Sequence, residues 1–284
     1  MGRYLDPTND VAFKRVFSDK TRMLSFLNSI LRLKDDSRII DLEFISPEEL
    51  PDFGIGKRAV FDLKVQDKSG NIYVIEMQNR KEDHFLKRMQ FYASTAYTNE
   101  ARIDISHNAL VPVILIAITN SKIFPDHVPC ISHHTTLEMR TKERFLFDVA
   151  YVFVELPKFN KKSNDLTEPE DSWLYFLSNP TNTTEPPSTI NDKAVLDAYT
   201  NIEEFRWSAE QYDAYIRARL AAEAVELTME GEYKRGEAKG IEQGSLDEKK
   251  KIAQLMLSKN MALSESSDLT GLSLEALRNL NSIS

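Results

Sequence analysis

The sequence predicts an α/β protein, with a mixed β-sheet flanked by helices and a helical region after it. Three observations lead to this fold class. Segments with helical spacing of apolar residues alternate with short β-rich runs over the first 160 residues. A continuous aliphatic run at 112–119 suits a central strand that is covered on both faces. Beyond residue 200, Glu, Ala, Lys, Arg and Leu dominate, which is typical of long helices.

The elements are expected in the order helix, three strands, helix and two strands. The segment 67–70, Asp-Lys-Ser-Gly, separates two β-rich runs and therefore predicts a hairpin. The expected elements are a helical segment at 10–33, broken near Ser18 with Asp19 or Thr21 as the second N-cap, an extended segment at 38–45, strands at 59–66 and 71–78, a helix at 83–101, and strands at 112–119 and 145–156.

These patterns divide the chain into three regions. We expect a core at 1–160, a connection of helices and loop at 161–200, and a long helical region at 201–284. Within these regions, prolines with several Thr and Asn predict a loop at 178–191. The segment 264–280 predicts a short helical pair, which weakly resembles half of a helix-turn-helix.

Four glycines interrupt the long helical region, and each is expected to destabilise a helix interior by about 1 kcal/mol relative to alanine. Gly236, Gly240 and Gly244 follow one another at four-residue spacing and share one face with no bulky side chain. A partner helix could approach this face closely, or the helix could fray and be mobile. Both interpretations stay open, and the first makes a homodimer through the C-terminal helices an expectation.

Composition restricts the cellular setting. A single cysteine, Cys130, excludes an internal disulfide and fits a reducing compartment. No apolar run is long enough to cross a bilayer, so we expect a cytoplasmic protein without a membrane partner. The net charge of −8 argues against a nucleic-acid partner. However, residues 1–100 hold 16 basic and 16 acidic residues, so the acidic excess lies in the remainder.

The hairpin carries the residues with the clearest chemistry. Folding it about 67–70 brings Asp62 opposite Ile75 or Glu76, and the two-residue period of a strand places Glu76 and Gln78 on one face. A carboxylate within an apolar strand needs a partner or a cation. Two carboxylates, an amide oxygen and the carbonyl of Met77 would suit Mg²⁺ or Mn²⁺. The alternative is a charged pair on the solvent face of an ordinary hairpin.

The next helix adds two polar residues. Arg88 and Tyr92 are four residues apart and so share a face. The arginine could bind a phosphate and the tyrosine could hydrogen-bond a ligand or water. The alternative is an ordinary amphipathic pair, with the tyrosine packed and the arginine solvated.

Longer motifs join these residues into one pattern. They are the opening Asp6-Pro-Thr-Asn-Asp10-Val-Ala-Phe13-Lys14-Arg-Val-Phe17, then Phe26-Leu-Asn28-Ser-Ile-Leu31, Phe61-Asp62-Leu63, Ile75-Glu76-Met77-Gln78 and a glycine-punctuated helix with a final Thr270-Gly-Leu-Ser. Over nearly its whole length the chain resembles the recombination-promoting nuclease and transposase family of the PD-(D/E)XK nuclease superfamily. The resemblance implies a restriction-endonuclease-like fold, DNA cleavage with a divalent cation, and a role in recombination, mobile elements or defence.

The same resemblance implies roles for individual residues. Asp62 and Glu76 become metal ligands, and Arg88 with Tyr92 matches the (Q/R)xxxY helix motif. Gln78 takes the position of the signature lysine.

Two further basic positions enter through the resemblance. Glutamine supplies no charge, so Lys64, two residues after Asp62 on the same face, is a candidate for the vacant lysine role. Asp10 and Lys14, one helical turn apart on the first helix, are expected near the site.

Three functions remain open from the sequence. The first is a metal-dependent DNA endonuclease that hydrolyses phosphodiester bonds. The second is a catalytically degenerate relative that binds nucleic acid or a protein partner without cutting, as Gln78 and the acidic balance suggest. The third is an assembly role carried by the C-terminal helices independently of the core.

Overall fold

The computed structural model describes residues 3–49, 59–100, 106–179, 181 and 183–281. The chain forms two compact units, Met1–Arg219 and Leu220–Ser284. None of the described helices is both long enough and apolar enough to span a membrane.

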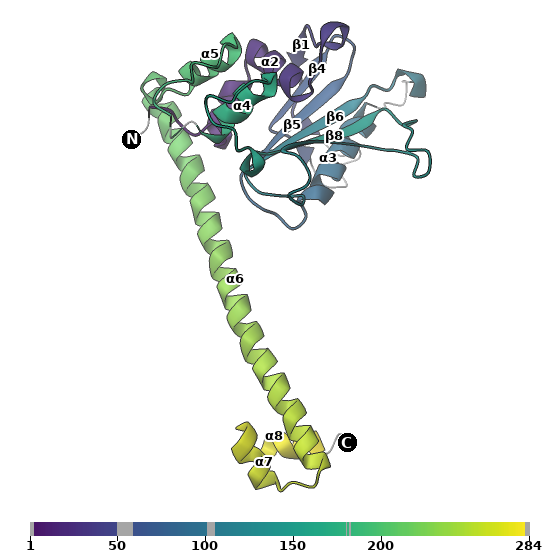
Figure 1. Cartoon of the computed structure of the whole chain (residues 1–284), viewed down its shortest axis with the longest axis vertical. Coiled ribbons are helices and arrows are strands. Elements are labelled where there is room, and N and C mark those ends of the chain that lie inside the picture. The colour runs from purple at the N-terminus through teal and green to yellow at the C-terminus, as the bar shows by residue number, and fades with distance from the viewer. Residues whose placement is uncertain (1–2, 50–58, 101–105, 180, 182, 282–284) are drawn as a thin grey trace. The chain divides into compact units, whose positions relative to one another are not determined.

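A six-stranded mixed sheet lies at the centre of the first unit (Figure 1). The central strands β5, β6 and β8 are parallel. β4 pairs antiparallel with β5, β7 pairs antiparallel with β8, and the edge strand β1 pairs antiparallel with β4. A separate two-stranded ladder precedes β4. In sheet order the strands are β1 (Leu42–Phe44), β4 (Leu63–Asp67), β5 (Ile72–Gln78), β6 (Val113–Thr119), β8 (Val149–Glu155) and β7 (Ile131–Thr135), and the small ladder joins β2 (Glu48–Glu49) to β3 (Ala59–Val60).

Helices cover both faces of this sheet. α3 (Phe85–Asn99) packs on one face because Phe85, Met89, Ala93 and Ala96 recur at helical spacing and are all buried. The other face packs against a layer of four helices in which Phe17, Phe26, Trp173 and Phe176 form an aromatic cluster. Those helices are α1 (Asp10–Phe17), α2 (Lys20–Ile30), α4 (Pro169–Ser178) and α5 (Lys193–Asn201); short 3-10 turns are η1 (Asp35–Ser37), η3 (His107–Ala109), η4 (Leu156–Lys158) and η6 (Glu204–Arg206).

Local chemistry explains the predicted break and the predicted turn. The Asp19 side chain accepts a hydrogen bond from Arg22 N–H and caps α2, so the break near Ser18 is confirmed. In the hairpin turn, Asp67 Oδ1 accepts from Ser69 N–H and Asn71 N–H. Gly70 adopts φ +90°, where a side chain would be strained.

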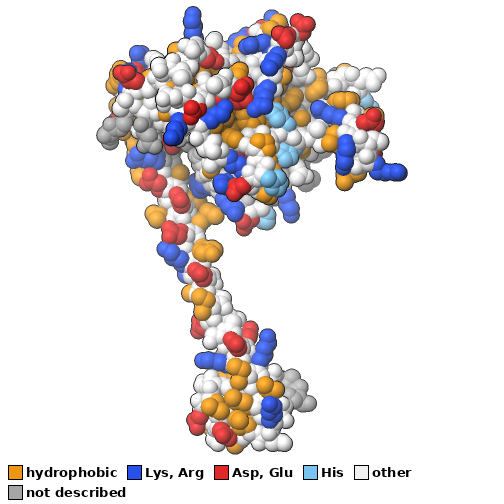
Figure 2. Space-filling model, viewed as in Figure 1, with side chains coloured by type: hydrophobic (Ala, Val, Ile, Leu, Met, Phe, Trp, Pro, Cys, Tyr) orange, Lys and Arg blue, Asp and Glu red, His pale blue; other side chains and the backbone are white. Residues whose placement is uncertain are grey.

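The second unit is helical. α6 (Ala209–Ser258) begins in the first unit, and α7 (Leu263–Thr270) and α8 (Leu274–Asn281) pack on its end around Ala253, Leu272 and Leu277. Acidic, basic and apolar side chains are mixed along the exposed surface of α6 (Figure 2). Among the described residues, a Cβ at Gly236, Gly240 or Gly244 would meet nothing within 4 Å, so the predicted glycine face of α6 is open there.

The expected α/β sheet with a helical C-terminal region is confirmed, and the differences concern single strands. The strand predicted at 59–66 is interrupted, because Val60 pairs with β2 whereas Leu63 pairs with β5. Asp62 therefore lies in a bend between β3 and β4, and not within a strand.

Two further strand boundaries differ from the prediction. The strand predicted at 145–156 begins only at Val149, and Phe145, Leu146 and Phe147 stay outside it, each at least 60% exposed. β7 was not predicted as an element of the sheet, because Ser-His-His-Thr lacks an apolar alternation. Its pairing with β8 is a tertiary contact that local pattern does not encode.

Candidate active site

Asp62 and Glu76 meet at the C-terminal end of β5. The β4–β5 register pairs Leu63 with Ile75, so one further step sets Asp62 against Glu76. Two hydrogen bonds hold the pair: Asp62 N–H donates to Glu76 Oε1 at 3.1 Å, and Met77 N–H donates to Asp62 Oδ2 at 2.7 Å. The structure therefore brings the two predicted carboxylates together, and each accepts a hydrogen bond from a backbone N–H of the other's segment.

Strand geometry predicts that the carbonyl of Met77 faces the same side as this pair. Along β5, backbone groups turn alternately to the two neighbouring strands. Gln78 uses its carbonyl toward the β6 side, where it accepts from Asn120 N–H at 3.0 Å. Met77 directs its N–H to Asp62. The N–H and carbonyl of one strand residue point to the same neighbouring strand, so the carbonyl is expected on that side as well. Beyond Leu63 no β4 partner continues the ladder there.

Burial and mutual repulsion shift the protonation of the pair. Glu76 is only 6% exposed, and burial, followed by the charge of Asp62, raises the pKa of Glu76 to about 8. Burial also raises the pKa of Asp62 above its usual range, against the hydrogen bond from Met77 N–H. The pair therefore favours either a shared proton or a bound cation at neutral pH.

Lys14 from α1 lies beside the carboxylates, as expected from the resemblance. Its Nζ is 2.8 Å from Asp10 Oδ1 and 3.7 Å from Asp62 Oδ1. The first helix thus contributes one cation and one acid to the site.

Gln78 is engaged in a hydrogen-bonded network with α3. Its Oε1 accepts from Arg88 Nη2 at 2.5 Å, and its Nε2 donates to Arg80 O at 2.9 Å and Glu82 Oε1 at 3.0 Å. Arg88 also pairs with Glu82 Oε2 at 2.8 Å. Within the described residues, the buried Nε–H of Arg88 has no hydrogen-bond partner.

Tyr92 and Lys64, the two remaining candidate residues, make different contacts. The Tyr92 ring packs edge-on against Phe61, with ring centroids 5.2 Å apart, and Arg88 lies 5.8 Å from the Tyr92 ring centre. Lys64 pairs with Val74 across the hairpin and so shares the sheet face of Glu76. Its Nζ, however, lies 3.5 Å from Glu100 Oε1, at the far end of α3 from Arg88.

Sequence patterns missed the residues that fasten α1 to the sheet. Asn79 donates to Thr8 O at 2.5 Å, and Asn120 donates both to Thr8 Oγ1 at 3.1 Å and to Asn79 Oδ1 at 2.7 Å. These contacts join three segments that are distant in the sequence. Glu82, which bridges Gln78 and Arg88, was also missed, because it lies in a polar connection without periodicity.

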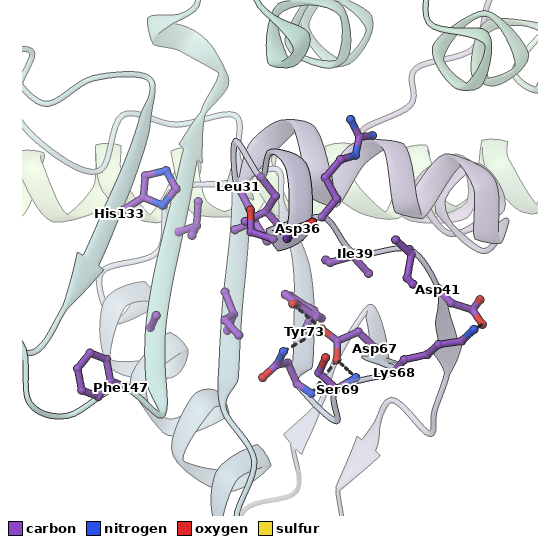
Figure 3. Close-up of a pocket in the computed structure, with 18 of the residues that line it drawn as sticks. Leu31, Asp36, Ile39, Asp41, Asp67, Lys68, Ser69, Tyr73, His133 and Phe147 are labelled. Carbon is purple, nitrogen blue, oxygen red and sulfur yellow. Dashed lines mark hydrogen bonds and ion pairs between the residues drawn. The ribbon is translucent and has the colours of Figure 1, made fainter.

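A pocket elsewhere on the first unit is separate from this site (Figure 3). It lies beside the β4–β5 turn, where Tyr73 O–H donates to Asp67 Oδ2 at 2.9 Å. His133 and Phe147 also line it, but none of the candidate catalytic residues does.

The donor set fits a hard divalent cation. Carboxylate oxygens of Asp62 and Glu76 and the Met77 carbonyl are oxygen ligands of the kind that Mg²⁺ and Mn²⁺ accept, with water completing the shell. Among the described residues, no group of three or more His, Cys, Asp and Glu is arranged to hold a metal ion. A cation here would therefore depend on two carboxylates and backbone or water oxygens.

The sheet, its helical layers and the carboxylate pair define a restriction-endonuclease-like α/β protein. The model of the PD-(D/E)XK nuclease family transposase matches residues 7–224, which is well over half of the chain. The chain belongs to this family. Searches of curated proteins and of solved structures found no match.

Proposed function

We propose that this protein is a divalent-metal-dependent DNA endonuclease that hydrolyses phosphodiester bonds in recombination or mobile-element biology. One observation carries the proposal: Asp62 and Glu76 converge with the Met77 backbone at the end of β5. Membership of a nuclease family supports DNA as the substrate.

Asp62, Glu76 and the Met77 carbonyl would hold Mg²⁺ or Mn²⁺. When bound, such a cation supplies Lewis-acid polarisation of the scissile phosphate and lowers the pKa of the attacking water. The carboxylates must be deprotonated to bind it, which the raised pKa of Glu76 opposes below about pH 8.

The α3 residues contact the DNA in this proposal. The Nε–H of Arg88, which has no hydrogen-bond partner in the part of the chain that the structure describes, supports its assignment to a phosphate oxygen. Gln78 positions Arg88 through the 2.5 Å hydrogen bond, and Tyr92 donates its hydroxyl to substrate or water. Lys64 shares the face of Glu76 and stays a prediction for the role of the signature lysine.

A plasmid nicking assay tests this function. We expect the purified full chain to convert supercoiled DNA to nicked or linear forms with Mg²⁺ or Mn²⁺, and not with EDTA. The reason is that phosphodiester hydrolysis requires a strong electrophile that the side chains alone do not provide. No cleavage by a protein that is folded and loaded with Mn²⁺ would contradict the proposal.

A degenerate, non-cutting relative is the second candidate. Gln78 stands in the lysine position and both ends of its amide are engaged with protein partners, which favours this reading. DNA binding without metal-dependent cleavage in the same assay would establish it.

We further propose a cytoplasmic homodimer through α6, because a double-strand break by single-site subunits needs two of them. The open face of Gly236, Gly240 and Gly244 supports close approach of a second helix. Sedimentation of the full chain is expected to give twice the 32.6 kDa mass of one chain. The matched variants Gly240→Leu, on this face, and Gly231→Leu, off it, locate the contact. A monomer at all concentrations would contradict this assembly.

A further inference from the structure

We propose that Lys14 is the catalytic cation of this site, taking from α1 the role that the signature gives to a lysine on the second strand. This inference rests on the proposed nuclease function. Gln78 occupies the signature position and has no charge, and its amide is held by Arg88, Arg80 and Glu82. A lysine charge next to the reacting phosphate would therefore come from another element.

Among the described lysines, Lys14 is the one that pairs with Asp62. Its Nζ lies 3.7 Å from Asp62 Oδ1, and Asp10 Oδ1 holds it from the other side at 2.8 Å. The Lys14 side chain remains 44% exposed, so the ammonium borders both the carboxylate pair and solvent. A DNA phosphate bound at the pair would arrive within reach of this ammonium.

The backbone of α1 is held firmly enough to aim a flexible side chain. Phe13, Val16 and Phe17 on either side of Lys14 are fully buried in the larger core. Asn9 caps the helix by accepting from Val11 N–H at 3.0 Å. The Thr8 contacts with the ends of β5 and β6 then fix the start of α1 next to Glu76.

The other two basic candidates pair with side chains other than Asp62 and Glu76. Lys64 is 5% exposed and its Nζ faces Glu100. Arg88, on α3, pairs with Glu82 and donates a hydrogen bond to Gln78. Lys14 approaches from the side of α1 and pairs with Asp62 itself.

In the proposed reaction Lys14 Nζ donates a hydrogen bond to a non-bridging oxygen of the scissile phosphate. This contact stabilises the charge that builds up as water adds to phosphorus and gives its proton to solvent, and as the P–O bond to the leaving oxygen breaks and that oxygen takes a proton from solvent. The proton stays on Lys14, and Asp10 acts as its positioning residue. A lysine ammonium is suited to this role as a compact point charge.

The test compares Lys14→Met and Lys14→Arg in the full chain. We expect Lys14→Met to slow single-turnover nicking at saturating DNA by about 10²- to 10³-fold, as when one charge-stabilising donor is removed. Lys14→Arg, which keeps the charge, should restore nicking to within about tenfold of the wild type. Lys20→Met is the matched control. Lys20 begins the next helix, α2, lies outside the site and also pairs with an aspartate, Asp41. It should nick at the wild-type rate.

Mn²⁺ binding, measured by calorimetry, separates catalysis from a structural role. Lys14→Met should bind Mn²⁺ within about threefold of the wild type or more tightly, because a cation beside Asp62 competes with the metal. A loss of Mn²⁺ affinity in parallel with nicking would overturn the catalytic assignment. Nicking by Lys14→Met at the wild-type rate would also overturn it. So would a loss of nicking that occurs in Lys64→Met but not in Lys14→Met. A wild type that never nicks removes the proposed function itself, whereas an active Lys14→Met removes this inference alone.

Discussion

Replacing Asp62 by asparagine is expected to lower metal-dependent nicking by about 10³-fold, equivalent to about 4 kcal/mol of transition-state stabilisation. The amide oxygen of asparagine can still accept the hydrogen bond from Met77 N–H, so the bend between β3 and β4 should persist. What is lost is one of the two carboxylates that would hold the cation. Glu76→Gln should have an effect of the same order, because its amide can still accept from Asp62 N–H.

The measurement is single-turnover nicking together with Mn²⁺ affinity, and both should fall. Asp126→Asn is a suitable control: Asp126 is 80% exposed, pairs with Lys122 and lies outside the site. It should match the wild type in both measurements. Undiminished cleavage by Asp62→Asn would place the active site elsewhere in the chain.

Metal affinity is expected to rise steeply with pH, by about tenfold per pH unit, until about pH 8 and then to level off. Burial and the charge of Asp62 raise the pKa of Glu76 from 4.5 to about 8. The folded protein therefore holds a proton on Glu76 that Mn²⁺ must displace. Calorimetry in buffers of different ionisation enthalpy should count close to one proton released at neutral pH.

The same shift predicts the pH dependence of stability without metal. A raised carboxyl pKa in the folded state contributes stability that is present below about pH 4.5 and is lost as pH rises through about 8. Glu76→Gln should remove both this dependence and the steep part of the Mn²⁺ profile, and Asp126→Asn should leave both. A flat Mn²⁺ profile in the wild type would show that the pair is ionised throughout.

Local patterns in the sequence were enough to predict the fold class and half of the candidate site. Helical spacing and the capping aspartate located α1 and α2, and turn chemistry at 67–70 set the hairpin register. Because antiparallel register follows from the turn, the facing of Asp62 and Glu76 could be expected within one residue. The family resemblance added the prediction that the two carboxylates bind a metal. The match to the family model confirms that the chain belongs to the family.

Only the tertiary structure decided which charges surround that pair. The approach of Lys14 to Asp62 depends on how α1 packs on the sheet and on the Thr8 contacts, which join segments far apart in the chain. The placement of α3 likewise decides two other contacts. It brings Glu100 to Lys64, and it brings Arg88 within hydrogen-bond distance of the Gln78 side chain. Periodicity reports which face a residue occupies, but a long side chain ends where its partners from other elements lie.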